Sequence, residues 1–279
     1  MKFCKLLKYD FENGILKKWY LYLITFLIAV IFVGDFYRKY TIINGNFDDK
    51  FTSTNILFYL FQGKEVFLPE WGSPFVFPVV WLFVFILSNF FTLDYPMKSL
   101  SGYGIQVITR IKKRAYWWKS KCIWIVFSNM IYFSIWYLGV FIFCKIAGVE
   151  ISLAYSNVIN EKLLEMQIET LTPELEIILL IILPILTSMS FNFLQLCLEL
   201  FIDKIYCFLI VVFLMFMSTY FKIPVAIGNF AMIKRSTYCI EDGMSVSMGL
   251  VINGMIIISC IVIGFWRINK YDILKKENI

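Results

Sequence analysis

Residues Glu174–Leu198 read ELEIILLIILPILTSMSFNFLQLCL, and this stretch decides the class of the fold. After Glu176 it contains no charged side chain. A helix needs about 20 predominantly apolar residues to cross the hydrocarbon core of a bilayer. The stretch is therefore predicted to be a transmembrane helix. Pro184 is expected to kink it unless a neighbouring side chain satisfies the carbonyl that the proline frees.

The rest of the chain repeats this character. Hydrophobic residues make up 60% of the 279 residues and charged residues 16%, whereas soluble domains average about 45–50% and about 25%. We therefore predict an all-α integral membrane protein that forms a single domain, 1–279, with six transmembrane helices. The other five predicted spans are Lys18–Tyr37, Pro74–Leu93, Lys121–Cys144, Lys204–Phe221 and Ser247–Trp266.

The distribution of charge predicts the orientation of these spans. If both termini are cytoplasmic, the cytoplasmic segments hold 17 of the 26 Lys and Arg residues but only 7 of the 20 Asp and Glu residues. Positively charged loops stay on the cytoplasmic side of a membrane. The sequence therefore predicts cytoplasmic termini, and the net charge of +6 is interpreted as a topology signal rather than as a nucleic-acid site.

The chain lacks the residues on which several kinds of catalytic site depend. The chain has no histidine, its seven cysteines show no C-x-x-C spacing, and no G-x-x-x-x-G-K-[ST] motif occurs. Imidazole bases, zinc sites and phosphate-binding loops depend on those residues. We therefore expect no catalytic residue, no metal site and no cofactor bound by this chain, and we do not expect it to be an enzyme.

The N-terminal segment 1–17 has an amphipathic pattern. Phe3, Leu7 and Phe11 fall on one side of a helix, and lysines lie on or near the other. A basic amphipathic helix of this kind lies in the interface of the membrane. The segment is predicted to be an interfacial helix, with a basic tail that lacks regular structure as the alternative.

The segment 94–120 reads DYPMKSLSGYGIQVITRIKKRAYWWKS and is strongly basic. It is too long for a turn between neighbouring helices. Trp117 and Trp118 are expected at the bilayer interface, where indole rings anchor. The segment is either a helix held at that interface or a docking element for a cytoplasmic partner.

The sequence resembles the type-2 permease subunits of ABC exporters of Gram-positive bacteria. The resemblance lies in the six predicted spans, in the amphipathic N-terminal helix and in the basic pattern G-Y-G-x-Q-x-x-x-R followed by W-W-x-S-K-C. The resemblance implies a cytoplasmic coupling helix that contacts an ATPase subunit. It also implies a second permease subunit, identical or paralogous, and ATP with magnesium bound by the ATPase. The residues that it assigns to coupling are Ser101, Gly102, Tyr103, Gly104, Gln106, Arg110, Lys113 and Arg114.

The segment 222–246 lies between the fifth and sixth predicted spans. It contains the apolar run IPVAIGNFAMI, which is too short to span and is interrupted by Pro224 and Gly228. A re-entrant or interfacial hairpin fits this pattern, and the permease family has short helices there. An ordinary outer loop with some buried side chains is the alternative.

Four polar residues form a stripe on the fourth span: Ser188, Asn192, Gln195 and Glu199. Their spacing of four, three and four puts them on one side of a helix. Polar groups are costly in hydrocarbon, so the stripe is expected to face protein or water. It is interpreted as hydrogen-bonding contacts between helices, as the lining of a substrate path, or as a proton relay.

The leading functional hypothesis is a permease subunit of an ATP-driven exporter in the plasma membrane of a bacterium, surrounded by lipids. Its cargo is expected to be amphipathic, such as an antimicrobial peptide, a lipid-like molecule or a drug. An ion-coupled secondary transporter needs ionisable groups near the bilayer midplane. That alternative, an intramembrane enzyme and a membrane sensor or assembly protein without transport remain open.

Overall fold

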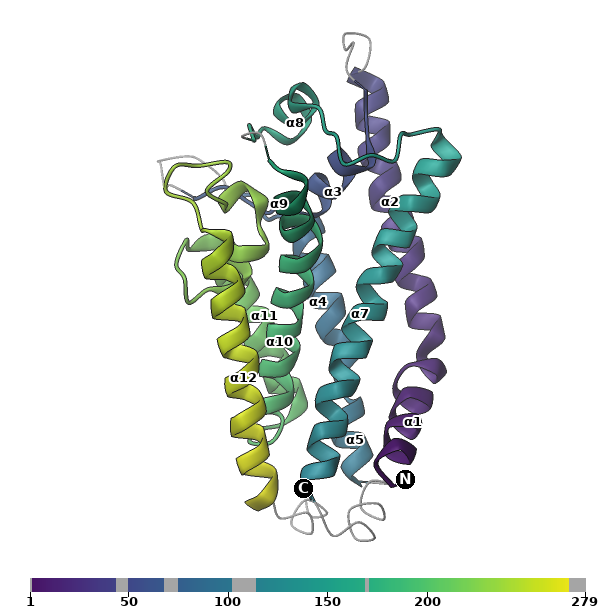
Figure 1. Ribbon diagram of the computed structural model, residues 1–279, viewed down its shortest axis with the longest axis vertical. Helices are drawn as coiled ribbons and strands as arrows, with labels where there is room; N and C mark the ends of the chain where they lie inside the picture. Colours follow the sequence, from purple (N-terminus) through teal and green to yellow (C-terminus); the bar gives the residue numbers. More distant parts are fainter. Residues whose placement is uncertain (1, 44–49, 68–74, 102–113, 169–170, 271–279) are drawn as a thin grey trace.

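The computed structural model describes residues 2–43, 50–67, 75–101, 114–168 and 171–270 (Figure 1). These residues form helices joined by short connections, and they contain no β-strand. The all-helical class predicted from the sequence is therefore confirmed.

Within the described residues, five segments are long and apolar enough to cross a membrane, as expected of a multi-pass membrane protein. They contain α1 (Lys2–Gly14) with α2 (Trp19–Ile43), α4 (Val79–Thr92) with α5 (Tyr95–Ser101), α7 (Arg114–Ala147), α9 (Pro173–Ile177) with α10 (Leu183–Leu198), and α12 (Val246–Lys270). The remaining predicted span is α11 (Lys204–Tyr220), which is apolar but has only 17 residues.

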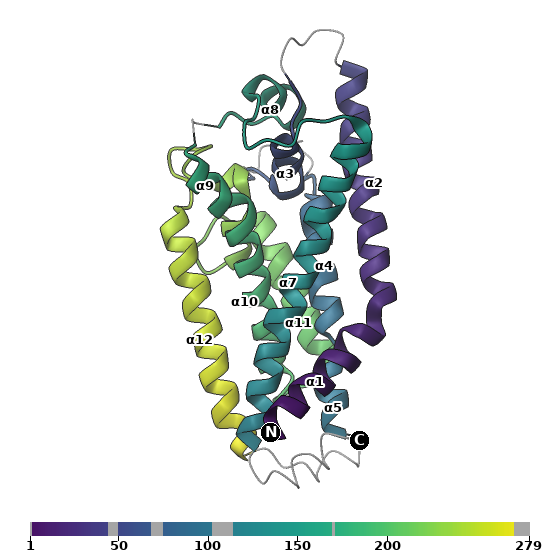
Figure 2. The ribbon, with the colours of Figure 1, turned by 45° about the vertical axis from the view of Figure 1, so that its right-hand side comes forward.

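The long helices run side by side along the long axis of the molecule (Figures 1 and 2). One end carries α1, α5 and the last turn of α12, and we refer to it as the terminal end. The opposite end carries α3 (Ser53–Phe61), α8 (Asn157–Leu164) and α9. The segment predicted as an interfacial helix is helical, and α1 bends away from the axis of α2 (Figure 2).

The helix α10 lies at the centre of the bundle, where it packs against α4, α7, α11 and α12. The outward faces of the surrounding helices are apolar: Ile31 on α2, Phe213 on α11 and Ile258 on α12 are each at least 60% exposed. An exposed apolar surface of this extent is what lipid covers in a membrane protein.

Trp117 and Trp118 do not anchor at an interface as expected. Both are about 1% exposed, because α7 begins at Arg114 and the two rings lie within its packed part, with Trp118 against α12. The indole nitrogen of Trp118 donates to the carbonyl of Ile261 at 2.9 Å. The ring fits because Gly264 has no side chain, since a Cβ there would lie 1.9 Å from Trp118.

The segment between α11 and α12 folds back against the bundle. It forms two short 3-10 turns, Ile227–Ala231 and Ile233–Arg235, and both are buried. The first turn packs against α10, α11 and α12. The hairpin is therefore buried against the bundle over residues 226–236, whereas Val225 just before them is 85% exposed.

Arg235 holds this hairpin to the end of α11. Its guanidinium donates to the carbonyls of Ser218, Thr219 and Phe221, which belong to the last turn of a helix and lack helical partners. Burial lowers the pKa of Arg235 to about 10, so the side chain remains protonated at neutral pH.

The backbone before Pro184 adapts to the proline. Residues Ile178–Ile182 form a π-helical turn. Pro184 cannot donate a hydrogen bond to the carbonyl of Leu180, four residues earlier. The hydroxyl of Tyr137, on α7, donates to that carbonyl at 2.9 Å. A neighbouring helix therefore satisfies the carbonyl, as membrane proteins require.

Replacing Tyr137 by Phe removes only this hydroxyl. We expect the Tyr137→Phe variant to lose about 1–3 kcal/mol of unfolding free energy, because the buried carbonyl of Leu180 loses its donor. The measurement is unfolding in mixed micelles by titration with a denaturing detergent. Tyr206→Phe, on the exposed side of α11, is the matched control, and an equal effect of the two substitutions contradicts the assignment.

Candidate functional site

The polar stripe of α10 points into the subunit. Ser188 and Asn192 are 0% exposed, Gln195 is 1% exposed and Glu199 is 2% exposed. The neighbouring helices present polar side chains to this stripe. The stripe therefore faces protein, one of the two environments expected for polar groups in a transmembrane helix.

The helix α4 supplies the first group of partners. The hydroxyl groups of Ser88 and Ser188 are 2.7 Å apart. The amide of Asn192 donates to the hydroxyl of Ser88 at 3.0 Å, and the hydroxyl of Thr92 donates to its carbonyl oxygen. Two turns of α4 therefore pair with two turns of α10.

The helix α7 closes the network from a third side. The carbonyl oxygen of Asn129 accepts from the hydroxyl of Ser188 at 2.8 Å and from that of Ser88 at 3.3 Å. We refer to Ser88, Thr92, Asn129, Ser188 and Asn192 as the central network. It connects α4, α7 and α10 through side chains that are all at most 3% exposed.

Towards the terminal end the stripe continues through Gln195. Its amide donates to the backbone carbonyl of Asn89 at 3.4 Å and to the carboxylate of Glu199 at 3.2 Å. Three buried amide atoms, Oδ1 of Asn89, Nδ2 of Asn129 and Oε1 of Gln195, have no hydrogen-bond partner within the described part of the chain.

These contacts favour a packing role for the stripe. Every hydroxyl or amide in the central network bonds to at least one other helix or to its own backbone. Such bonds between transmembrane helices hold the helices in register. Glu199 is the only titratable member of the stripe and lies beyond the end of α10. A proton relay needs several titratable groups along the helix, so the stripe does not favour one.

A second buried polar site was missed by the sequence analysis. The amine of Lys121, on α7, donates to the carboxylate of Asp10, on α1, at 2.6 Å. The side chains of both residues are at most 1% exposed. The hydroxyl groups of Ser120 and Tyr95 also donate to this carboxylate. We refer to these four residues as the ionic cluster.

The ionic cluster joins three elements at the terminal end: α1, α7 and α5. Besides its ion pair, the Lys121 amine lies 4.5 Å from the centre of the Tyr95 ring, within the range of a cation–π contact. A buried charge needs a paired and hydrogen-bonded partner, and here the carboxylate receives three donors. The cluster therefore fixes α1 against the start of α5.

The sequence did contain a signal for this cluster. Asp10 follows Leu6 by four residues and Leu7 by three, so it lies on the apolar side of α1. A carboxylate on the buried side of a helix needs a cation as its partner. Lys121 had been assigned only as the first residue of a span, whereas α7 begins seven residues earlier, at Arg114.

The residues assigned to ATPase coupling fall mostly where the structure gives no description. Gly102, Tyr103, Gly104, Gln106, Arg110 and Lys113 lie outside the described residues. Ser101 is the last residue of α5, and Arg114 is the first residue of α7. The guanidinium of Arg114 donates to the carbonyl of Asn269 at 3.1 Å, near the end of α12.

Among the described residues no group of three His, Cys, Asp or Glu side chains could hold a metal ion. No family model matches the sequence, and no match was found among curated proteins or solved structures. The function is therefore inferred from the sites themselves and from the sequence patterns.

The central network predicts a specific loss of stability. Asn192→Leu keeps the size of the side chain but leaves its partners on α4 unpaired, so we expect a loss of about 1–3 kcal/mol of unfolding free energy. Leu194→Ile, on the other side of α10, is the control and should cost less than about 1.5 kcal/mol. Equal losses for both variants, measured by unfolding in mixed micelles, would exclude this role.

The ionic cluster predicts strong coupling between its two charges. Asp10→Leu should cost about 3–5 kcal/mol because the Lys121 amine is left buried without its anion. The double variant Asp10→Leu/Lys121→Met should cost less than the sum of the single variants. A double-mutant cycle measures this difference. The exposed pair Lys8 and Glu12, 3.8 Å apart, is the matched control with a coupling of about 0–1 kcal/mol, and additive costs at the ionic cluster would contradict the prediction.

Proposed function

We propose that this chain is the permease subunit of an ATP-driven ABC exporter in the plasma membrane of a bacterium. The observation that carries the proposal is where the two helices that flank the basic segment 102–113 end and begin. The helix α5 ends and α7 begins at the terminal end, which also carries α1 and the last turn of α12 (Figure 1). The charge pattern favours a cytoplasmic location for that end, where an ATPase would be reached.

The proposal includes α11 as a sixth span. Its first residue, Lys204, forms an ion pair with Asp94, just before α5. Its last turn is bonded by Arg235, which also donates to the carbonyl of Lys64, after the end of α3. Seventeen residues rise about 25 Å as a helix, and the shortest transmembrane helices have about 17 residues. An even number of spans agrees with the position of the start of α1 and the end of α12, which both lie at the terminal end.

The contacts of the ionic cluster and of the central network would couple a movement of an ATPase to the transmembrane helices. The ionic cluster fastens α1 to α5 and α7, and the central network fastens α4 to α7 and α10. A displacement applied at the basic segment would therefore move these helices together, as in a rigid-body transition. ATP and magnesium would be bound by the ATPase, and the permease would perform no covalent chemistry.

The working unit in this proposal has two permease subunits, identical or paralogous, and two ATPase subunits. The cargo is an amphipathic molecule such as a peptide, a lipid-like compound or a drug. An ion-coupled transporter is the less supported candidate, because the one carboxyl group of the polar stripe, Glu199, lies beyond the end of α10 rather than at its middle.

The proposal is tested at the basic segment. Affinity purification of the tagged chain from native membranes should recover an ABC ATPase, identified by mass spectrometry. We expect Arg110→Glu and Lys113→Glu each to lower the ATP hydrolysis of the complex roughly tenfold, which corresponds to a loss of about 1.4 kcal/mol of contact energy. The physical reason is reversal of the charge that faces the ATPase.

Two controls accompany this test. Lys162→Glu reverses an exposed charge on α8, at the opposite end of the bundle, and should leave ATP hydrolysis unchanged. Labelling of Lys162→Cys from outside the cell with an impermeant maleimide, in a background without Cys4 and Cys239, verifies insertion in each charge variant. If the inserted Arg110 and Lys113 variants keep full activity, or if no ATPase is recovered, the proposed function is wrong.

A further inference from the structure

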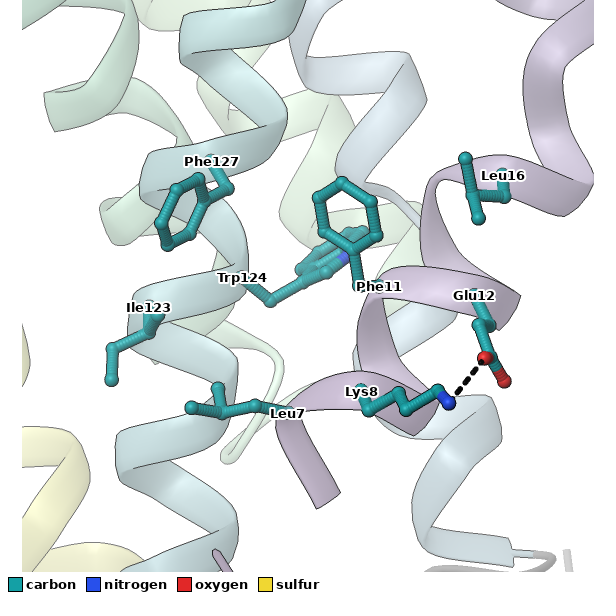
Figure 3. A pocket seen from close by; sticks show the side chains of 8 residues that line it. All are labelled: Leu7, Lys8, Phe11, Glu12, Leu16, Ile123, Trp124 and Phe127. Atoms are coloured by element: carbon teal, nitrogen blue, oxygen red, sulfur yellow. Dashed lines mark ion pairs between the residues drawn. The ribbon is translucent and has the colours of Figure 1, made fainter. Parts of the chain in front are cut away.

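A groove opens between α1 and α7 on the side of the bundle (Figure 3). It has a volume of about 430 Å³, which is in the usual range of ligand pockets, about 300–1,000 Å³. Its walls are Leu7, Phe11 and Leu16 on one side and Ile123, Trp124 and Phe127 on the other, with Lys8 and Glu12 at the rim.

The lining is apolar and open to the outside. Phe11 is 39% exposed, Leu16 is 55% exposed and Phe127 is 53% exposed. Trp124 forms the floor and is only 2% exposed. The end of α1 crosses this ring closely because Gly14 has no side chain, since a Cβ there would lie 2.3 Å from the Trp124 indole nitrogen.

The floor of the groove is rigid. The Trp124 ring packs against Tyr95, with ring centres 4.7 Å apart, and the Tyr95 hydroxyl bonds to Asp10 of the ionic cluster. The cluster holds α1 against α7, and no side chain of the described residues fills the groove between the two walls.

The rim itself carries one lysine and one glutamate, and the exposed charges around it on the same part of the chain are mostly positive. The Asp10 carboxylate is neutralised inside the protein by Lys121, so the exposed charges on this part of the chain are Lys5, Lys8 and Lys17 against Glu12 alone. Lys8 is 77% exposed and lies 3.8 Å from Glu12, a separation at which exposed pairs contribute little. The amine of Lys8 is therefore able to turn towards a stronger anion.

An apolar groove beside an exposed segment with three lysines and one glutamate matches one class of molecule. A phospholipid combines a long apolar chain with an anionic phosphate, and the cytoplasmic leaflet is rich in anionic lipids that attract basic segments. The groove also continues into the exposed apolar surface of α2, where Trp19 is 65% exposed and Leu23 is 49% exposed. A lipid chain can enter from that side without leaving the membrane.

We propose that this groove is a binding site for one acyl chain of an anionic phospholipid, with its phosphate at Lys8 and Lys5. The site would fix the interfacial helix α1 to the membrane on one side while the ionic cluster fixes it to the protein on the other. The proposal requires only that the chain is inserted in a membrane, and it does not depend on export or on an ATPase.

Fluorescence quenching tests the site. The chain is reconstituted in nanodiscs of phosphatidylcholine that contain a low mole fraction of lipid brominated in its acyl chains, either phosphatidylglycerol or phosphatidylcholine. Comparison with Trp124→Phe isolates the emission of Trp124. Trp266→Phe isolates that of Trp266, which is 56% exposed on α12 and reports on the surrounding bulk lipid.

We expect brominated phosphatidylglycerol to quench Trp124 several-fold more than brominated phosphatidylcholine does, and both lipids to quench Trp266 alike. Lys5→Gln combined with Lys8→Gln should remove the preference. Ile123→Phe, and independently Leu7→Phe from the opposite wall, should fill the groove and remove the Trp124 quenching, whereas Ile31→Phe on the exposed side of α2 should not.

Two results would overturn the proposal. Equal quenching of Trp124 by the two lipids, at the level seen for Trp266, would show bulk lipid only. Absence of quenching by either lipid would show that a protein segment or another ligand covers the groove. Recovery of the inserted protein in nanodiscs verifies that Ile123→Phe and Leu7→Phe are folded. A loss of quenching in these folded variants then reports loss of the site rather than loss of the fold.

Discussion

A polar group inside hydrocarbon has no water to bond with, so its partner has to come from the protein. The internal structure of this bundle follows from that requirement. The carbonyl freed by Pro184 is met by Tyr137, and the carbonyls at the end of α11 are met by Arg235. The same requirement gathers hydroxyl and amide groups of three helices around Ser188 and Asn192. The contacts of Tyr137 and of the central network join helices that are far apart in the sequence, whereas Arg235 reaches back 17 residues to Ser218.

The elements themselves were predictable from the sequence, because composition and periodicity act locally. The apolar segments, the N-terminal helix and the inward direction of the stripe on α10 all follow from residue spacing. Periodicity also shows that Ser188 and Asn192 share a face. It does not show which helix that face meets, so the partners Ser88, Thr92 and Asn129 could be identified only from the packing of three helices.

The ionic cluster shows a different limit. Asp10 on the apolar side of α1 was visible in the sequence, but its cation is 111 residues away and was assigned to the edge of a span. The expectation for Trp117 and Trp118 was wrong for a related reason. Aromatic residues near a predicted span boundary usually anchor at the interface, but α7 begins earlier than its apolar core and Gly264 on α12 leaves room for the ring of Trp118. Boundaries set by packing are not encoded in local hydropathy.

The separation of Asp10 from Lys121 also has a consequence for synthesis. Chains grow at about 5–20 residues per second, so Asp10 is incorporated roughly 6–22 s before Lys121, which is 111 residues later. During that interval the carboxylate has no internal partner and keeps the nascent α1 at the water-exposed surface of the membrane. Because α1 precedes α7 in the sequence, we expect α1 to reach its final position only after α7 has been inserted, so that the contacts of the ionic cluster form late in assembly.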